Sequence, residues 1–194
     1  MEHISSLCVY CGSAVGADPI YRETAVRLGR LMAENRIRLV FGGGRVGLMG
    51  VLADAVIEAG GSTVGVIPRF LDTREVGHRG IGELHIVDSM HTRKNLMFEL
   101  SDAFAVLPGG FGTLDETFEI ITWRQLRLHD KPIMLVDANG YWQPFLRLID
   151  HVIREGLARP ECRQLFTLVP DVDDVIAALR RQPEPAVPDL PERL

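Results

Sequence analysis

The 194-residue chain lacks the features that mark membrane-spanning, secreted and polyanion-binding proteins. No apolar run approaches the ~18 residues needed to cross a bilayer. The first residues do not combine a charged segment with a long apolar core, as a signal peptide would. The formal net charge is −5, so the surface as a whole does not attract nucleic acid or anionic lipid. We therefore expect a cytoplasmic protein with neither a nucleic-acid partner nor a membrane partner.

Cysteine and lysine are both scarce. The three cysteines, Cys8, Cys11 and Cys162, are too few for a disulfide scaffold, and no second Cys-x-x-Cys pair completes a zinc site. We interpret Cys8 and Cys11 as reduced core residues rather than a redox pair. Lys94 and Lys131 are the only lysines, which argues against a pyridoxal phosphate enzyme with its Schiff-base lysine and larger cofactor-binding architecture. The sequence predicts no metal and no organic cofactor.

Short apolar runs alternate with amphipathic stretches along the chain. We expect strands over 4–10, 37–41, 62–67, 103–107, 132–136 and 165–168, and helices over 18–34, 46–59, 89–100, 113–127, 142–155 and 172–181. This alternation predicts an α/β fold: one Rossmann-like domain over 1–182, with a doubly wound parallel sheet and helices on both faces. Residues 69–88 break the rhythm and predict a structureless lid or binding loop. The proline-rich segment 183–194 predicts a disordered tail.

One glycine-rich segment, Pro-Gly-Gly-Phe-Gly-Thr-Leu-Asp-Glu over 108–116, follows an apolar run and opens a helical pattern. A strand, a glycine turn and a helix place backbone N–H groups and the positive end of a helix dipole around an anion. The segment therefore predicts a phosphate cradle that carries its own carboxylate. The alternative is a simple capping box, in which Thr113 is the N-cap and Glu116 lies three residues on.

A second glycine segment, Gly42-x-Gly44-x-x-Gly47, formally matches the dinucleotide fingerprint. That fingerprint also needs an acidic residue at the end of the next strand, to hold the ribose hydroxyls. Pro68 and Arg69 stand there instead. We interpret these glycines as sites of close strand–helix packing or as part of another nucleotide pocket, rather than as a nicotinamide site.

Arg93 lies at the centre of the apolar stripe of its predicted helix. On a helical wheel, Met90, Leu96, Met97 and Leu100 all fall within about 60° of it. A buried guanidinium is costly without an anion, and the start of a helix disfavours a cation further. We therefore expect a negative group to meet Arg93. The alternative is an arginine that extends from the edge of the core to solvent.

These two motifs, 90–94 and 108–116, resemble the signature pair of the LONELY GUY (LOG) family. Its members are cytokinin-activating enzymes that hydrolyse cytokinin riboside 5′-monophosphates, and they have often been labelled lysine decarboxylases. The similarity extends over nearly the whole chain, through 8–13, 42–50, 121–126, 131–132 and 139–142. The resemblance implies an N-glycosidase that releases free base and ribose 5-phosphate from a purine nucleoside 5′-monophosphate. It also implies a homodimer.

By the same resemblance, Arg93 and Glu116 are the catalytic pair. The implied substrate-binding residues, besides these two, are Glu75, Lys94, Gly110, Phe111, Gly112, Thr113, Leu114, Asp115 and Thr122. Near the start of its helix, Glu116 is expected to be ionised, which suits charge stabilisation rather than general-acid catalysis. After Glu75 the chain departs from the family's usual Thr-Gly-Glu, which leaves the base open between a cytokinin, adenine and another purine. A nucleotide-binding carrier without turnover is the alternative function.

Overall fold

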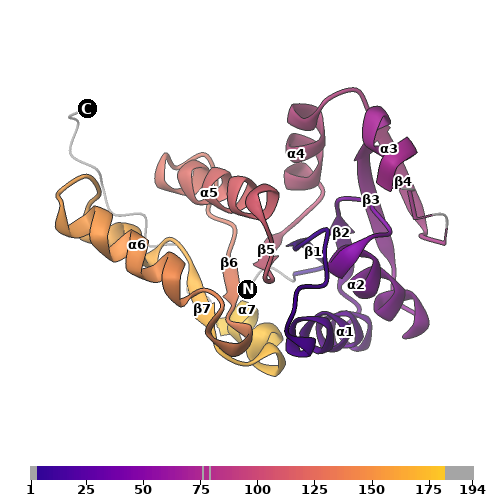
Figure 1. Cartoon of the computed structure of the whole chain (residues 1–194), viewed down its shortest axis with the longest axis horizontal. Helices are drawn as coiled ribbons and strands as arrows, with labels where there is room; N and C mark the ends of the chain where they lie inside the picture. The colour runs from indigo at the N-terminus through magenta and orange to yellow at the C-terminus, as the bar shows by residue number, and fades with distance from the viewer. Residues whose placement is uncertain (1–3, 76, 79, 182–194) are drawn as a thin grey trace.

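The computed structural model describes residues 4–75, 77, 78 and 80–181 (Figure 1). The strands are β1 (Ser6–Tyr10), β2 (Arg38–Phe41), β3 (Thr63–Pro68), β4 (Glu83–Val87), β5 (Ala103–Val106), β6 (Ile133–Val136) and β7 (Thr167–Val169). The α-helices are α1 (Pro19–Glu34), α2 (Gly47–Glu58), α3 (Arg69–Glu75), α4 (Met90–Glu99), α5 (Phe111–Gln125), α6 (Gln143–Arg154) and α7 (Val175–Arg181). Short 3₁₀ turns are η1 (Ala138–Gly140), η2 (Pro160–Gln164) and η3 (Val172–Asp174).

The seven strands form one parallel sheet in the order β4-β3-β2-β1-β5-β6-β7. The chain builds outward from β1 to β4, then returns to the other side of β1 with β5. The strand order therefore reverses between β1 and β5. Because the loops that follow these two strands lead away in opposite directions, they leave a crevice in which such folds bind their ligands.

Helices cover both faces of the sheet, as the strand–helix alternation predicts (Figure 1). Successive strand residues point to opposite faces, so in β1 Leu7 and Val9 pack with α1, α2 and α7, whereas Cys8 and Tyr10 pack with α4, α5 and α6. With both faces buried, the central strands are apolar over most of their length. The α/β, doubly wound, single-domain prediction is confirmed. The cysteines are free, and Cys8 and Cys11 are buried, as expected.

The prediction of a structureless loop over 69–88 is wrong, because this segment contains α3 and an additional strand, β4. Strand β4 pairs with β3 at the edge of the sheet, where His85 lies opposite Val66. An edge strand is only partly covered, and here Glu83 and Ile86 are exposed. The strand therefore lacks the continuous apolar run that identifies its buried neighbours. The tail predicted over 183–194 lies outside the described residues.

Candidate active site

The glycine turn of 108–110 lies against the loop that follows β1. The Gly12 N–H donates a hydrogen bond to the Pro108 carbonyl at 3.0 Å, and the Gly12 carbonyl accepts one from Leu48 N–H at 2.9 Å. A side chain at Gly109 would place its Cβ 2.8 Å from the Gly12 nitrogen and 2.1 Å from Thr113 Oγ1. The turn therefore requires glycine at 109, and its position is fixed from the β1 side.

Helix α5 begins at Phe111, two residues earlier than predicted. Gly110 is its N-cap and makes no side-chain capping bond. Thr113 is consequently a buried residue inside the first turn, so the capping-box interpretation of Thr113 and Glu116 is wrong. The first amides of a helix have no intrahelical acceptor. Because Gly110, Phe111 and Gly112 are exposed, these N–H groups and the positive dipole end are open to an anion.

Arg93 is buried, with 6% of its surface exposed, as the helical wheel predicts. It lies in the second turn of α4, whose first turn is capped by a hydrogen bond from Thr92 N–H to Ser89 Oγ at 3.1 Å. The guanidinium Nη2 donates to the Gly42 carbonyl at 3.2 Å. Within the described part of the chain, the Arg93 Nε has no hydrogen-bond partner. A buried cation with an unused donor is a site that an anion would complete.

Gly42 has a function that neither interpretation of its motif anticipated. A Cβ at this position would lie 1.8 Å from Arg93 Nη2 and 3.2 Å from the sulfur of Met49. The glycine therefore makes room for the guanidinium and, through its carbonyl, binds it. This contact explains Gly42 without a nicotinamide cofactor.

Glu116 lies on the inner side of α5 and is 9% exposed. Burial raises its pKa from 4.5 to about 7, although the positive charges of Arg93 and Lys94 act in the opposite direction. The expectation of an ionised Glu116 is therefore corrected, because loss of hydration outweighs the helix dipole and the nearby cations. Arg93 and Glu116 form no direct ion pair among the described residues, so each remains available to a ligand.

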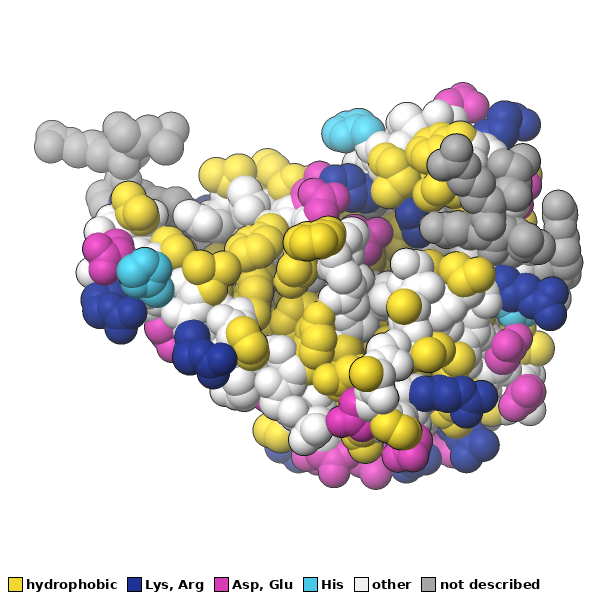
Figure 2. Space-filling view, viewed as in Figure 1, with side chains coloured by type: hydrophobic (Ala, Val, Ile, Leu, Met, Phe, Trp, Pro, Cys, Tyr) yellow, Lys and Arg dark blue, Asp and Glu magenta, His cyan; other side chains and the backbone are white. Residues whose placement is uncertain are grey.

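Lys94 ties the two helices together. Its Nζ lies 3.2 Å from Asp115 Oδ2 and 2.9 Å from Glu119 Oε1, both on α5. Burial lowers the pKa of Lys94, but the hydrogen bonds to Glu119 and Asp115 raise it further than burial lowers it. Acidic and basic side chains gather accordingly between α4 and α5 (Figure 2). The bridge holds the helix of Arg93 against the helix of Glu116.

The remaining predicted site residues are not all brought together. Leu114 is half-buried in the first turns of α5, close to the glycine turn. Thr122 is exposed and lies 11 residues beyond Phe111, which is about 16 Å along the helix. Glu75 is the last residue of α3, and its side chain lies outside the described part of the structure. Sequence reasoning missed Tyr141, whose hydroxyl donates to the Gly109 carbonyl. Its sole sequence signal was its place in the motif at 139–142.

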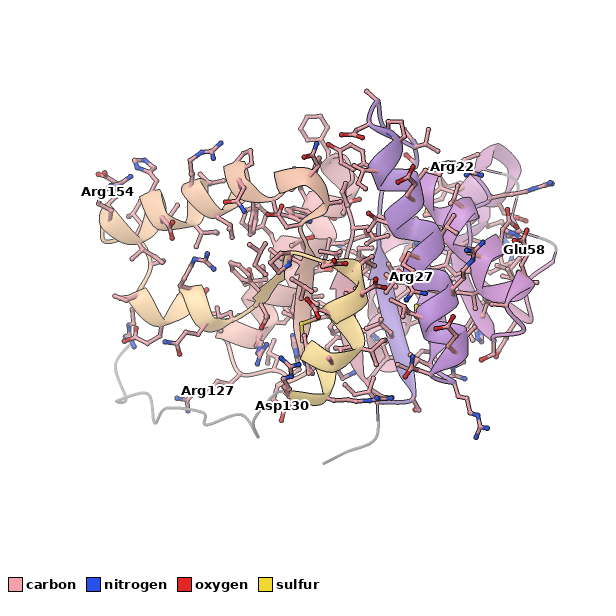
Figure 3. All side chains as sticks on the ribbon, turned by 90° about the horizontal axis from the view of Figure 1, so that it is seen from below. Arg22, Arg27, Glu58, Arg127, Asp130 and Arg154 are labelled. Atoms are coloured by element: carbon pink, nitrogen blue, oxygen red, sulfur yellow. The ribbon has the colours of Figure 1, made fainter. Side chains whose placement is uncertain are left out.

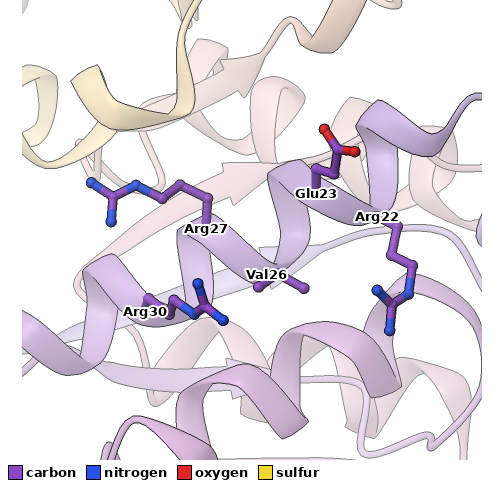
Figure 4. Close-up of a pocket in the computed structure, with 5 residues that line it drawn as sticks. All are labelled: Arg22, Glu23, Val26, Arg27 and Arg30. Carbon is purple, nitrogen blue, oxygen red and sulfur yellow. The ribbon is translucent and has the colours of Figure 1, made fainter.

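An open groove lies away from this site, on the outer surface of α1 (Figures 3 and 4). This open groove of about 260 Å³ is lined by Arg22, Glu23, Val26, Arg27 and Arg30. Arg27 is engaged by Asp173. The groove contains none of the predicted site residues. Among the residues that the structure describes, no helix is long and apolar enough to cross a membrane, and no cluster of three His, Cys, Asp or Glu side chains could hold a metal.

The chain is similar in sequence to several named proteins. A family model described as "Possible lysine decarboxylase" matches residues 49–179. A Rhodococcoides fascians protein named cytokinin riboside 5′-monophosphate phosphoribohydrolase is 47% identical over 176 residues, which cover 90% of this chain and 89% of that protein. An Arabidopsis thaliana protein of the same name, LOG7, is 42% identical over 188 residues, or 97% and 86% of the two chains.

Solved structures share the fold at lower identity. The molybdenum cofactor binding protein from Rippkaea orientalis superposes with a TM-score of 0.69 and 20% identity, covering 93% of this chain and 98% of its own. A molybdenum cofactor carrier protein from Chlamydomonas reinhardtii gives a TM-score of 0.67 and 21% identity, with coverage of 92% and 97%. At this level of identity, the likeness shows a common fold.

Replacing Gly42 by alanine is expected to weaken binding of a phosphate-bearing probe, AMP, by about tenfold or more. The new Cβ would displace the Arg93 guanidinium. Because the clash involves the end of a flexible side chain, the melting temperature should change little. Calorimetric titration measures the affinity, and Gly82→Ala is the control because its Cβ meets the Thr63 carbonyl at an ordinary 3.4 Å. Unchanged AMP affinity in Gly42→Ala would contradict this account.

Replacing Glu116 by glutamine is expected to stabilise the protein at alkaline pH. A pKa raised from 4.5 to about 7 means that the folded protein retains a proton that the unfolded chain releases. The stability from this proton is fully present below about pH 4.5 and is lost as pH rises through about 7. Because glutamine resembles the protonated acid, the variant should gain ~3 kcal/mol at pH 8 and less than ~1 kcal/mol at pH 5.

Urea unfolding at the two pH values measures this difference. Glu99→Gln, at an exposed position on α4, is the matched control for the loss of one carboxyl group. An equal gain for Glu116→Gln at both pH values would show that the folded protein does not raise the pKa of this carboxyl group.

Proposed function

Because the chain belongs to the LONELY GUY (LOG) family, we propose that it hydrolyses the N-glycosidic bond of cytokinin riboside 5′-monophosphates and of AMP. The products are the free base and ribose 5-phosphate. The observation that carries the proposal is the meeting of three features at one end of α5. These are an uncapped helix start, a buried arginine with an unused donor, and a buried carboxyl group.

The 5′-phosphate is proposed to bind at the start of α5. The amides of 111–113 supply N–H donors, and the helix dipole supplies a favourable potential without a metal ion. Arg93 approaches the same site from α4, with Nη2 held by Gly42 and with Nε unpartnered among the described residues. A guanidinium held in this way can bind the phosphate or the ribose without first giving up a protein partner.

Glu116 is proposed to act on the ribose. Cleavage of the bond to the base builds positive charge on the sugar, as in glycoside hydrolysis, and an ionised carboxylate stabilises that charge. The same carboxylate can accept a hydrogen bond from a ribose hydroxyl or orient the attacking water. With a pKa of about 7, Glu116 is present in both forms near neutral pH, so its protonated form is also a proton source for the leaving base.

The structure does not favour the lysine chemistry that the description of the family model suggests. Lys94 is held between Asp115 and Glu119, and the Lys131 Nζ donates to the Phe98 carbonyl at 2.7 Å and lies 3.9 Å from the centre of its ring. Neither amine is free to form a Schiff base, and the chain has no other lysine. Hydrolysis that uses Arg93 and Glu116 needs no such amine.

Incubation with AMP and with isopentenyladenosine 5′-monophosphate tests the proposal, with released base measured by chromatography. We expect the wild-type protein to release base, and Glu116→Gln to lower turnover by about 100-fold or more, as loss of a charge-stabilising group does. Glu99→Gln, the exposed control, should retain full activity. Tight binding without release would instead support the carrier function. Intact turnover in Glu116→Gln would contradict the assigned role of this residue. Relative turnover over a panel of purine monophosphates then identifies the base.

A homodimer and a cytoplasmic location are part of the same proposal. Apolar side chains lie exposed on and beyond α5: Phe111 is 93% exposed, Leu126 59% and Leu128 66%, while Phe118 is 39% exposed between them (Figure 2). Exposed apolar side chains along one helix and its continuation favour contact with a second copy of the chain. The free cysteines are compatible with a reducing compartment.

The double variant Leu126→Asp/Leu128→Asp is expected to shift the protein from dimer to monomer, because it places two charges in the proposed interface. Light scattering coupled to size-exclusion chromatography measures the mass. Leu157→Asp, at a more exposed leucine beyond the end of α6 (82% exposed), is the control and should remain dimeric. A monomeric wild-type protein would overturn the proposed dimer, and a double variant that stays dimeric would place the interface elsewhere.

A further inference from the structure

A tyrosine from a distant connection contacts the glycine turn. Tyr141 follows η1 in the connection between β6 and α6, and its hydroxyl donates a hydrogen bond to the Gly109 carbonyl, 32 residues earlier in the chain. Gly109 and Gly110 have no side chains that could hold the peptide group between them. Gly110 is exposed, and a Cβ there would meet no atom within 4 Å. The Tyr141 hydroxyl is therefore the side-chain group that holds this peptide group, through its carbonyl.

The Tyr141 ring is itself held in place. It packs edge-on against Tyr21, with ring centres 5.6 Å apart, and against Trp142 at 5.1 Å. Two residues before it, Asn139 adopts a left-handed conformation with φ of 51° and donates to Asp18 Oδ2 at 2.9 Å. The other carboxylate oxygen of Asp18 caps α1 by accepting from Ile20 N–H at 3.0 Å. The connection that carries Tyr141 is thus anchored to the start of α1.

The geometry of the peptide group links the Tyr141 contact to the anion site. In a planar trans peptide, the carbonyl oxygen and the following N–H point in opposite directions. A hydrogen bond that fixes the Gly109 carbonyl therefore also fixes the direction of the Gly110 N–H. That N–H is the first of the row of amides that leads into α5. Without the hydroxyl, the Gly109–Gly110 peptide loses this constraint, and its carbonyl oxygen, with its negative charge density, can turn toward the anion.

We propose that Tyr141 is a positioning residue that directs the Gly110 amide at the 5′-phosphate of the substrate. The inference rests on the proposed function in taking the start of α5 as the phosphate site. Tyr141 does not itself touch the phosphate in this arrangement; it acts through the peptide group between Gly109 and Gly110. Its contribution is consequently specific to ligands that carry a phosphate.

Tyr141→Phe removes the hydroxyl and keeps the ring that packs against Tyr21 and Trp142. Tyr21→Phe is the matched control, because Tyr21 packs in the same aromatic cluster. Its hydroxyl makes no hydrogen bond within the described residues. Calorimetry compares two ligands that differ in the phosphate: ribose 5-phosphate and adenosine. We expect Tyr141→Phe to bind ribose 5-phosphate about five- to tenfold more weakly than wild type, as loss of one hydrogen bond does. Adenosine affinity should be unchanged, and Tyr21→Phe should match wild type for both ligands.

Two results would overturn the inference. One is unchanged affinity of Tyr141→Phe for ribose 5-phosphate. The other is an equal loss for ribose 5-phosphate and adenosine, which would indicate a general structural role. The proposed hydrolysis is judged separately, by base release from AMP. A wild-type protein that binds ribose 5-phosphate but releases no base would overturn the hydrolysis and leave the Tyr141 inference to be decided by the affinity ratio.

Discussion

The burial of two opposite charges that do not touch, Arg93 and Glu116, is the constraint on which the site depends. Each loses hydration, and a direct ion pair would recover part of that cost. Instead, Arg93 binds a backbone carbonyl at Gly42, and Glu116 has its pKa raised to about 7. The absence of a side chain at Gly42 serves this separation, because it leaves room for the guanidinium beside the Gly42 carbonyl, while the Lys94 bridge keeps α4 against α5. The burial of these two groups without a direct ion pair lowers the folding stability at the place where a phosphorylated ligand is proposed to bind.

The elements of the site come from distant parts of the chain, and the strand order brings them together. Reversal of the order between β1 and β5 places the loop of Gly12 beside the turn of Gly109. Helix α4 then delivers Arg93 and α5 delivers Glu116 to the same face of the sheet. The connection after β6 adds Tyr141. Five of the segments that resemble the LOG family meet here: 8–13, 42–50, 90–94, 108–116 and 139–142.

The buried parts of the fold and of the site could be predicted because burial leaves a local pattern. The central strands are largely apolar runs, and the helical wheel predicts the interior position of Arg93 from sequence alone. Features that depend on tertiary contacts left no such pattern. The start of α5 at Phe111 follows from the glycine turn, and the raised pKa of Glu116 follows from dehydration by residues distant in sequence. The contact between Gly42 and Arg93 joins residues 51 positions apart, which no local pattern records.

The edge strand β4 was not predicted from the sequence because several of its residues are polar and exposed. The same residues affect whether copies of the chain can pair through this edge. A parallel sheet that ends in an open strand offers unpaired backbone groups to any other extended chain. The charged side chain of the exposed Glu83 makes β4 a poor template for such pairing. The property that made this strand hard to predict thus also disfavours the pairing of another chain at the β4 edge of the sheet.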